Sequence, residues 1–255
     1  MGIFDLPICA IVTGANRGFG RELCFVISSE LPANSTLVLL GRNRDALESE
    51  KKELASKTPS INILIFHNFE CNRLDTQSLL QFFNDHDNLF KDLSSLLLVH
   101  NAGSVGDPSQ SCVDLGLPQV TDYMNINFNS MVATNSIVLN KFASCKHKTV
   151  INLSSLLALQ PSKSLSLYCS CKAARDMFFK ILAIEQPLCR VLSYAPGPME
   201  TAMFNQIRNE SFDDELKKMF QDMVPVNMTD SAKKLMALLK EDRFTSGDHV
   251  DYFDF

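Results

Sequence analysis

Six short runs of aliphatic and β-branched residues recur along the chain, separated by longer segments with helical periodicity. The runs are almost continuously hydrophobic, which is typical of strands in a parallel sheet covered on both faces. The predicted strands are residues 8–12, 36–40, 61–66, 96–100, 149–153 and 190–194, and the predicted helices are residues 21–31, 44–56, 76–90, 120–142 and 166–185. Strand–helix alternation requires right-handed crossovers. The pattern therefore predicts an α/β fold with a doubly wound parallel sheet and helices on both faces.

The size and composition of the chain suit one domain with one large core. With 255 residues and 45% apolar content, residues 1–255 are expected to form a single domain. The formal net charge of −5 provides no general attraction to nucleic acid or to an anionic membrane. No apolar run approaches the ~20 residues that span a bilayer, and the first residues do not resemble a signal peptide. We expect a cytoplasmic protein without nucleic-acid or membrane partners, whose eight cysteines are reduced.

A glycine-rich turn lies between the first predicted strand and the first predicted helix. It contains Gly14, Gly18 and Gly20. Glycines let the backbone turn tightly, approach a pyrophosphate closely and place the helix N-terminus beneath it. The turn therefore predicts a dinucleotide phosphate site. The alternative is a tight strand–helix turn that binds no ligand.

Arginines follow the second predicted strand, where a site for NAD would usually place an acidic residue near the adenosine ribose. Arg42 and Arg44 lie there, and no acid occurs before Asp45. Arg42, together with Arg17 from the glycine turn, could bind a 2′-phosphate, because a planar guanidinium matches phosphate geometry. This pattern predicts NADP(H) as the cofactor. The alternative is that Arg42 and Arg44 are solvated residues at a helix start.

A tyrosine and a lysine lie four residues apart in the predicted helix 166–185, so they share one helix face. An ammonium at Lys172 beside the phenol of Tyr168 would favour the phenolate and make the tyrosine a better acid–base group near neutral pH. Ser155 follows the fifth predicted strand and could donate a hydrogen bond to a substrate carbonyl. Ser154 is the competing choice. The pattern predicts a carbonyl reductase in which Tyr168 donates the proton.

These motifs resemble the short-chain dehydrogenase/reductase family over essentially the whole chain. The turn at Asn101, the helix asparagine Asn127 and the turn at Gly197 match further family motifs, whereas Glu70 replaces the usual aspartate. The resemblance implies a Rossmann-type fold, and it implies that Asn127 supports a proton-relay water and the catalytic lysine. The implied cofactor contacts are Gly14, Asn16, Arg17, Gly18, Phe19, Gly20, Arg42, Asn43, Phe69, Glu70, Asn101, Ala102, Gly103, Tyr168, Lys172, Met199, Glu200, Thr201, Ala202, Met203 and Phe204.

Other stretches are similar to the members of this family that reduce pterins. They are residues 154–156, 158–161, 167–169, 172–177, 194–198 and the tail 246–251. This similarity implies a homodimer that reduces a pterin side-chain ketone with NADPH, with Asp251 binding the amino-pyrimidine edge of the pterin through paired hydrogen bonds. Asp254 lies nearby and could be mistaken for this anchor. The implied substrate contacts are Ser155, Leu156, Tyr168, Gly197 and Asp251.

Two alternatives remain open for function. The same chemistry could act on small dicarbonyl or aromatic ketones, or the chain could be a dinucleotide-binding regulator without catalysis. The segment 199–228 follows the sixth strand and is predicted to cover the ligand crevice as a lid, with an ordinary amphipathic surface helix as the alternative. Neither Cys169 and Cys171 nor the five histidines show metal-ligand spacing, so no metal site is predicted.

Overall fold

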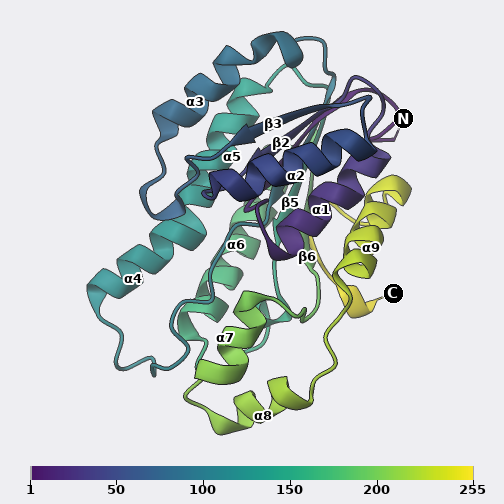
Figure 1. The fold of residues 1–255 in the computed structure, drawn as a ribbon. Helices are drawn as coiled ribbons and strands as arrows, with labels where there is room; N and C mark the ends of the chain where they lie inside the picture. Colours follow the sequence, from purple (N-terminus) through teal and green to yellow (C-terminus); the bar gives the residue numbers. More distant parts are fainter. Residues whose placement is uncertain (1, 255) are drawn as a thin grey trace.

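The computed structural model describes residues 2–254, which form a seven-stranded parallel sheet with helices packed on both faces (Figure 1). The strand order is β3-β2-β1-β4-β5-β6-β7. The strands are β1 (Ile8–Thr13), β2 (Thr36–Leu40), β3 (Asn62–Phe66), β4 (Ser95–His100), β5 (His147–Leu153), β6 (Cys189–Ala195) and β7 (Asp248–Asp251). The predicted doubly wound α/β fold is confirmed, and the order reverses between β1 and β4.

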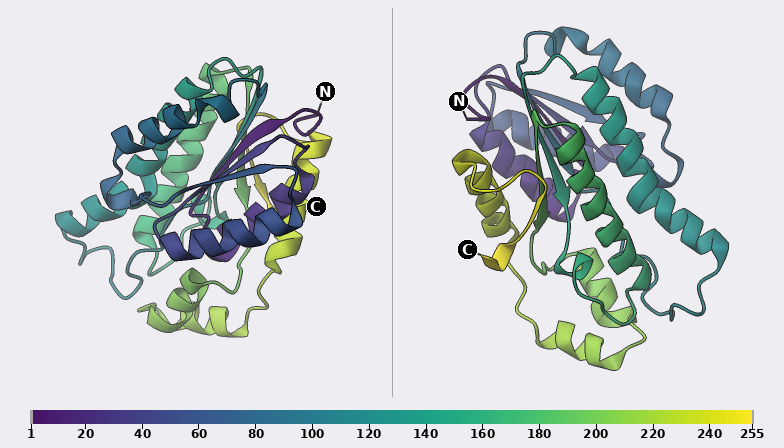
Figure 2. Two further views of the ribbon diagram at one scale, coloured as in Figure 1. Left: turned by 45° about the horizontal axis from the view of Figure 1, so that its top comes forward. Right: turned by 180° about the vertical axis from the view of Figure 1, so that it is seen from behind.

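Helices cover the sheet in two layers, which Figure 2 shows from two further directions. The first layer holds α1 (Gly18–Glu30), α2 (Arg44–Lys57) and α9 (Met228–Glu241), and the second holds α3 (Thr76–Asp85), α5 (Ser130–Lys141) and α6 (Ser166–Glu185). Alternate residues of a strand point to opposite faces. Ile8, Ala10 and Val12 therefore enter the core under α1, while Cys9 and Ile11 enter the core under α6.

Two predicted helices are interrupted in the structure. The segment 76–90 ends its α-helix at Asp85 and continues as a short 3-10 turn, Asp87–Leu89. The segment 120–142 is divided into α4 (Leu117–Met124), a π-helical turn (Asn125–Asn129) and α5. A π turn inserts an extra residue into a helix and is often found at functional sites.

The last strand, β7, was not among the predicted strands. It has only four residues, Asp-His-Val-Asp, and Val250 is its one apolar side chain. It lies at the edge of the sheet, where it pairs with β6 alone. An edge strand this short and polar gives no continuous hydrophobic run, so the pattern used for the other six strands could not detect it.

The segment 199–228, predicted to be a lid, contains two short helices, α7 (Ala202–Glu210) and α8 (Asp214–Asp222). They lie beyond the carboxyl edge of the sheet, below the strands in Figure 1. Among residues 2–254, no helix combines the length and the apolar character that crossing a bilayer requires.

Candidate active site

The glycine turn joins β1 to α1 at the carboxyl edge of the sheet. Gly14 and Gly18 have φ angles of +67° and +54°, a region that residues with a side chain rarely adopt. A Cβ on Gly20 would lie 2.2 Å from the carbonyl oxygen of Gly14, so no side chain fits there. The backbone therefore forms a close-packed cradle, and the N-terminus of α1 begins within it. Such a cradle fits the pyrophosphate of a dinucleotide.

Hydrogen bonds fix this turn to the end of β4. The side-chain amide of Asn101 donates to the carbonyl oxygens of Thr13 (2.9 Å) and Gly14 (3.2 Å). The backbone N–H groups of Asn101 and Ala102 both donate to Oγ1 of Thr13, each at 3.0 Å. The expected turn 101–103 thus acts as a brace for the glycine turn, at the point where the strand order reverses.

The arginines predicted to select the cofactor lie at the same edge. Arg17, Arg42 and Arg44 are all exposed, and none of them forms an ion pair within residues 2–254. Asn43 has a structural role, because its side chain caps α2 by accepting a hydrogen bond from the N–H of Ala46 (3.0 Å). The exposed guanidinium groups are available to an anionic ligand.

Other expected cofactor contacts divide into buried and exposed groups. The side chains of Phe19 and Phe69 are buried in the two cores, so only their backbone faces the site edge. The side chain of Asn16 lies over Gly41, where an added Cβ would be 2.8 Å from Oδ1. Glu70 is exposed at the start of a short 3-10 turn.

The catalytic candidates meet at the carboxyl end of β5. Tyr168 in the first turn of α6 is 8% exposed, and Ser155 is close enough to its hydroxyl to lower its pKa. Lys172, one turn later, donates from Nζ to the carbonyl oxygen of Leu153 at 2.6 Å, and its Nζ lies 5.5 Å from the centre of the Tyr168 ring. The predicted grouping of serine, tyrosine and lysine is present in the fold.

The electrostatics differ from the sequence expectation. Burial raises the pKa of Tyr168 above its usual value, and this effect exceeds the opposing influence of the Ser155 hydrogen bond and the Arg175 charge. Burial, aided by the Arg175 charge, lowers the pKa of Lys172 to about 7. The expected net lowering of the Tyr168 pKa is therefore not found, because desolvation outweighs the favourable interactions of the phenolate.

The two candidate serines have different partners. Ser154 is buried, and its Oγ donates to Oδ1 of Asp176 at 2.6 Å. Ser155 is partly exposed, and its Oγ caps the 3-10 turn Leu156–Ala158 by accepting from the N–H of Leu157 (3.2 Å) while lying close to Tyr168. The geometry favours Ser155 as the group that meets a substrate, because the hydroxyl of Ser154 is already used inside the protein.

Asn127 lies in the π turn and is buried. Its side-chain oxygen accepts from the N–H of Ser104 (2.7 Å), and its backbone carbonyl accepts from Nη1 of Arg175 (3.2 Å). Arg175 therefore contacts the carbonyl of this residue, and the expected support of a proton-relay water and of Lys172 stays a prediction.

The lid segment packs directly over the tyrosine. An apolar cluster joins Tyr168 to α7 and α8, with the members Val105, Leu165, Tyr168, Phe204, Ile207, Leu216 and Phe220. Polar contacts close its rim: Gln206 donates to the carbonyl of Gly106 (3.0 Å), and the N–H of Asp213 donates to Oγ of Ser164 (3.1 Å). Residues on α7 and α8 thus limit access of water to Tyr168.

The start of the lid contains the last group of expected cofactor contacts. Met199 is buried, Glu200 pairs with Arg208 (3.1 Å), and Met203 packs against the lid cluster. Thr201 caps α7 by accepting from the N–H of Phe204, while Ala202 is the first helical residue. A Cβ placed on Gly18 would lie 3.7 Å from Cγ2 of Thr201, so this end of the lid adjoins the glycine turn.

The expected substrate contacts outside the catalytic group lie along the same edge. Asp251 ends β7, beside Ala195 at the end of β6. One of its carboxylate oxygens, Oδ1, accepts from the N–H of Phe253 (3.0 Å), and the N–H of Asp251 donates to Asp254 (2.7 Å). Asp254 is therefore a cap for the strand end. Leu156 is 45% exposed beside Ser155, and Gly197 has a φ of +80°.

Arg175 and Asp176 are the residues that the sequence reasoning missed. Both are buried, at 1% and 4% exposure, and they extend a network beneath the catalytic group. Their positions, seven and eight residues after Tyr168, place them on the same inward face of α6 as Tyr168 and Lys172. Charged residues at such spacing on an otherwise apolar helix were the available signal.

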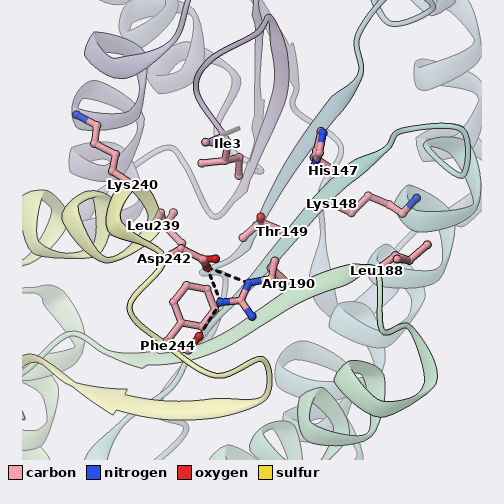
Figure 3. Close-up of a pocket in the computed structure, with 11 residues that line it drawn as sticks. Ile3, His147, Lys148, Thr149, Leu188, Arg190, Leu239, Lys240, Asp242 and Phe244 are labelled. Atoms are coloured by element: carbon pink, nitrogen blue, oxygen red, sulfur yellow. Dashed lines mark hydrogen bonds and ion pairs between the residues drawn. The ribbon is translucent and has the colours of Figure 1, made fainter.

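One cavity of the molecule lies away from this site. It has a volume of about 120 Å³ and is lined by residues near the amino ends of β5 and β6, opposite the edge that holds Tyr168 (Figure 3). Its cationic groups already have partners: Nε of Arg190 donates to Asp242 (3.0 Å), Lys148 donates to backbone carbonyls, and Lys240 pairs with Glu30. A smaller hollow of about 10 Å³ adjoins Tyr168.

Comparison with known proteins identifies the family. The short chain dehydrogenase family model matches residues 8–211. Sepiapterin reductase of Rattus norvegicus is 39% identical over 99% of this chain and 98% of its own length, and that of Xenopus tropicalis is 40% identical over 97% of each. The crystal structure of a short chain dehydrogenase from Shigella flexneri complexed with NADP has the same fold, with a TM-score of 0.79 at 22% identity over 98% of both chains. The chain thus belongs to the short-chain dehydrogenase family, with sepiapterin reductases among its relatives.

Proposed function

We propose that this protein reduces pterin side-chain ketones with NADPH, converting sepiapterin to dihydrobiopterin and 6-pyruvoyl-tetrahydropterin to tetrahydrobiopterin. The observation that carries the proposal is the meeting of Ser155, Tyr168 and Lys172 at one sheet edge with the glycine turn and Asp251. Similarity to sepiapterin reductases along almost the whole chain supports the choice of a pterin.

The proposed cofactor contacts follow from the cradle. Gly14, Gly18 and Gly20 with the N-terminus of α1 would bind the pyrophosphate, and Arg17 with Arg42 would bind the 2′-phosphate. NADPH, when bound, supplies the hydride. The remaining cofactor roles proposed for residues 101–103 and 199–204 rest on their position around this cradle.

The chemistry assigned to the chain is delivery of a proton to a developing alkoxide. Ser155 donates a hydrogen bond to the ketone oxygen and stabilises negative charge as it forms there. Tyr168, whose pKa is raised by burial, keeps its proton until that charge develops and then transfers it to the oxygen. The ammonium group of Lys172 lies one helical turn away, where its positive charge stabilises the phenolate that remains on Tyr168.

Asp251 is the proposed substrate anchor. A carboxylate can accept two parallel hydrogen bonds from the adjacent N–H groups of an amino-pyrimidine. Its position at the end of β7, next to the turn at Gly197, puts it on the edge that also holds Ser155. A small ketone without that ring has no N–H groups that could donate hydrogen bonds to this carboxylate.

Assembly as a homodimer is part of the proposal. α6 carries an exposed apolar row on its outer face, with Met177, Ile181 and Ile184 exposed by 58%, 44% and 75%. Residues at this spacing lie on one side of a helix, and an isologous contact would bury them. We further propose a reducing, cytoplasmic location, supported by eight free cysteines.

A comparison of two substrates tests the function. Wild-type enzyme and Asp251→Ala would be assayed for NADPH oxidation with sepiapterin and with a small diketone. We expect efficient reduction of sepiapterin by the wild type, and a loss of roughly 10- to 100-fold in kcat/KM for sepiapterin in the variant, with a much smaller loss for the diketone. Preference of the wild type for small diketones would favour the dicarbonyl reductase alternative. Absence of turnover with every carbonyl would favour a non-catalytic regulator.

A further inference from the structure

A row of polar side chains crosses four adjacent strands beneath the active site. In the register of the sheet, His100 on β4 lies beside Asn152 on β5, Asn152 beside Ser193 on β6, and Ser193 beside His249 on β7. Neighbours in register point to the same face of a parallel sheet. These four residues therefore form one continuous polar line across four strands.

Asp176 of α6 collects hydrogen bonds from this row. Its Oδ1 accepts from Asn152 (2.9 Å) and from Ser154 (2.6 Å), and its Oδ2 accepts from Nδ1 of His249 (2.6 Å). Burial by itself would raise the pKa of this carboxyl, but the hydrogen bonds from His249 and Ser154 hold it below its usual value. The carboxylate is thus stable in the interior only while its donors remain in place.

The hydrogen bond from His249 joins two elements with different roles. Within residues 2–254 it is the one side-chain hydrogen bond recorded between α6 and β7. Asp176 lies four residues after Lys172 on the inward face of α6. His249 lies two residues before Asp251, so both side chains point to the same face of β7.

Strand β7 has few other restraints. It has four residues, pairs on one side only, and contributes Val250 as its single core side chain. The Nε2 atom of His249 has no hydrogen-bond partner among the described residues, so Asp176 is the polar partner of this side chain. Without the bond, Oδ2 of a buried carboxylate would lose its donor, and the strand would lose its side-chain link to α6.

We propose that the Asp176–His249 pair is a positioning device that sets the separation between the catalytic face of α6 and the substrate anchor Asp251. Neither residue touches the reacting atoms. The pair determines specificity, because a pterin must reach Tyr168 at one end and Asp251 at the other, whereas a small ketone needs only the first. This inference rests on the proposed function, since it concerns how that substrate is held.

The test compares His249→Leu with His249→Asn. Leucine removes the donor, while the amide nitrogen of asparagine lies near the position of Nδ1 and can still donate to Asp176. His147→Asn is the matched control, because His147 is exposed at the opposite, amino end of β5. KM and kcat would be measured for sepiapterin and for a small diketone, with thermal unfolding to verify that each variant is folded.

We expect His249→Leu to raise KM for sepiapterin by roughly tenfold, with a smaller change in kcat and little change for the diketone. His249→Asn should recover most of the loss, and His147→Asn should match the wild type. If His249→Leu fails to fold, His249→Gln takes its place in the comparison with His249→Asn. The glutamine amide lies one methylene further from the backbone, so it is displaced from the position of Nδ1 that the asparagine amide occupies.

Different results overturn different statements. Equal losses with both substrates, unchanged KM in His249→Leu, or a His249→Asn variant as defective as His249→Leu would each overturn the positioning role. Failure of the wild-type enzyme to reduce sepiapterin would instead overturn the proposed function, and the inference with it.

Discussion

The ammonium of Lys172 donates a hydrogen bond to the backbone carbonyl of Leu153, at 2.6 Å, and lies 5.5 Å from the ring centre of Tyr168. The lysine is therefore fixed to the end of β5, one turn of helix away from the tyrosine. The ring of Tyr168 belongs to an apolar cluster to which α7 and α8 also contribute.

Tyr168→Phe should abolish most turnover while leaving cofactor binding intact. The substitution removes only the hydroxyl that donates the proton, and the ring can still fill the lid cluster. We expect kcat to fall by on the order of 10²- to 10⁴-fold. Fluorescence titration with NADPH should give a Kd close to that of the wild type. Retention of substantial turnover would remove Tyr168 from the mechanism.

Arg42→Ala should weaken selection of NADPH over NADH. The guanidinium of Arg42 is exposed at the end of β2 and is proposed to bind the 2′-phosphate, which NADH lacks. We expect the Kd of NADPH to rise roughly 10- to 100-fold, while the Kd of NADH changes little. Arg44→Ala is the matched control, because Arg44 is also exposed but is the first residue of α2. Equal effects of the two variants on both cofactors would argue against a specific phosphate contact.

The rate of reduction should fall as the pH rises through about 7. Burial and the Arg175 charge lower the pKa of Lys172 to about 7, so the lysine is charged below that pH and neutral above it. Reduction needs the charged form, because it stabilises the phenolate that Tyr168 leaves behind. A profile of kcat/KM against pH should show this decreasing limb. The residual activity of Lys172→Arg should show no decrease in kcat/KM near pH 7, since a guanidinium stays charged throughout this range. A wild-type profile that is flat to pH 9 would contradict the assignment.

Glu50→Gln should make the protein more stable at pH 8 than the wild type, with little difference near pH 4. Glu50 is 2% exposed on α2, and burial raises its pKa from 4.5 to about 8 against the opposing charge of Arg21. Between these values the unfolded chain releases the proton and the folded chain keeps it, so the free energy of unfolding falls as pH rises. The slope is at most about 1.4 kcal/mol per pH unit. Chemical unfolding of both proteins across pH 4–9 would measure it, and parallel curves would refute a buried, protonated Glu50.

Local sequence pattern predicted most of the sheet because the six predicted strands are mainly apolar runs. A strand buried on both faces is recognised by its continuous apolar composition. The strand at residues 36–40 is an example, because its predicted and observed bounds agree. β7 could not be detected in this way, since three of its four residues are polar and the partner of His249 lies on the distant helix α6. The π turn at Asn127 was equally invisible, because the residues on either side continue a helical pattern.

The sequence by itself determined which chemical groups the site contains: a glycine turn before a helix, a tyrosine and lysine one helical turn apart, and a serine after a strand. These are local relationships, set by spacing along one element or across one turn. Only the tertiary structure decided the pKa values of these groups and their hydrogen-bond partners. Burial under α7 and α8 raises the pKa of Tyr168, and Arg175 lies close enough to help lower that of Lys172. The packing of α6 against the sheet brings Asp176 to His249 of β7, and both desolvation and this packing depend on segments far apart in the chain.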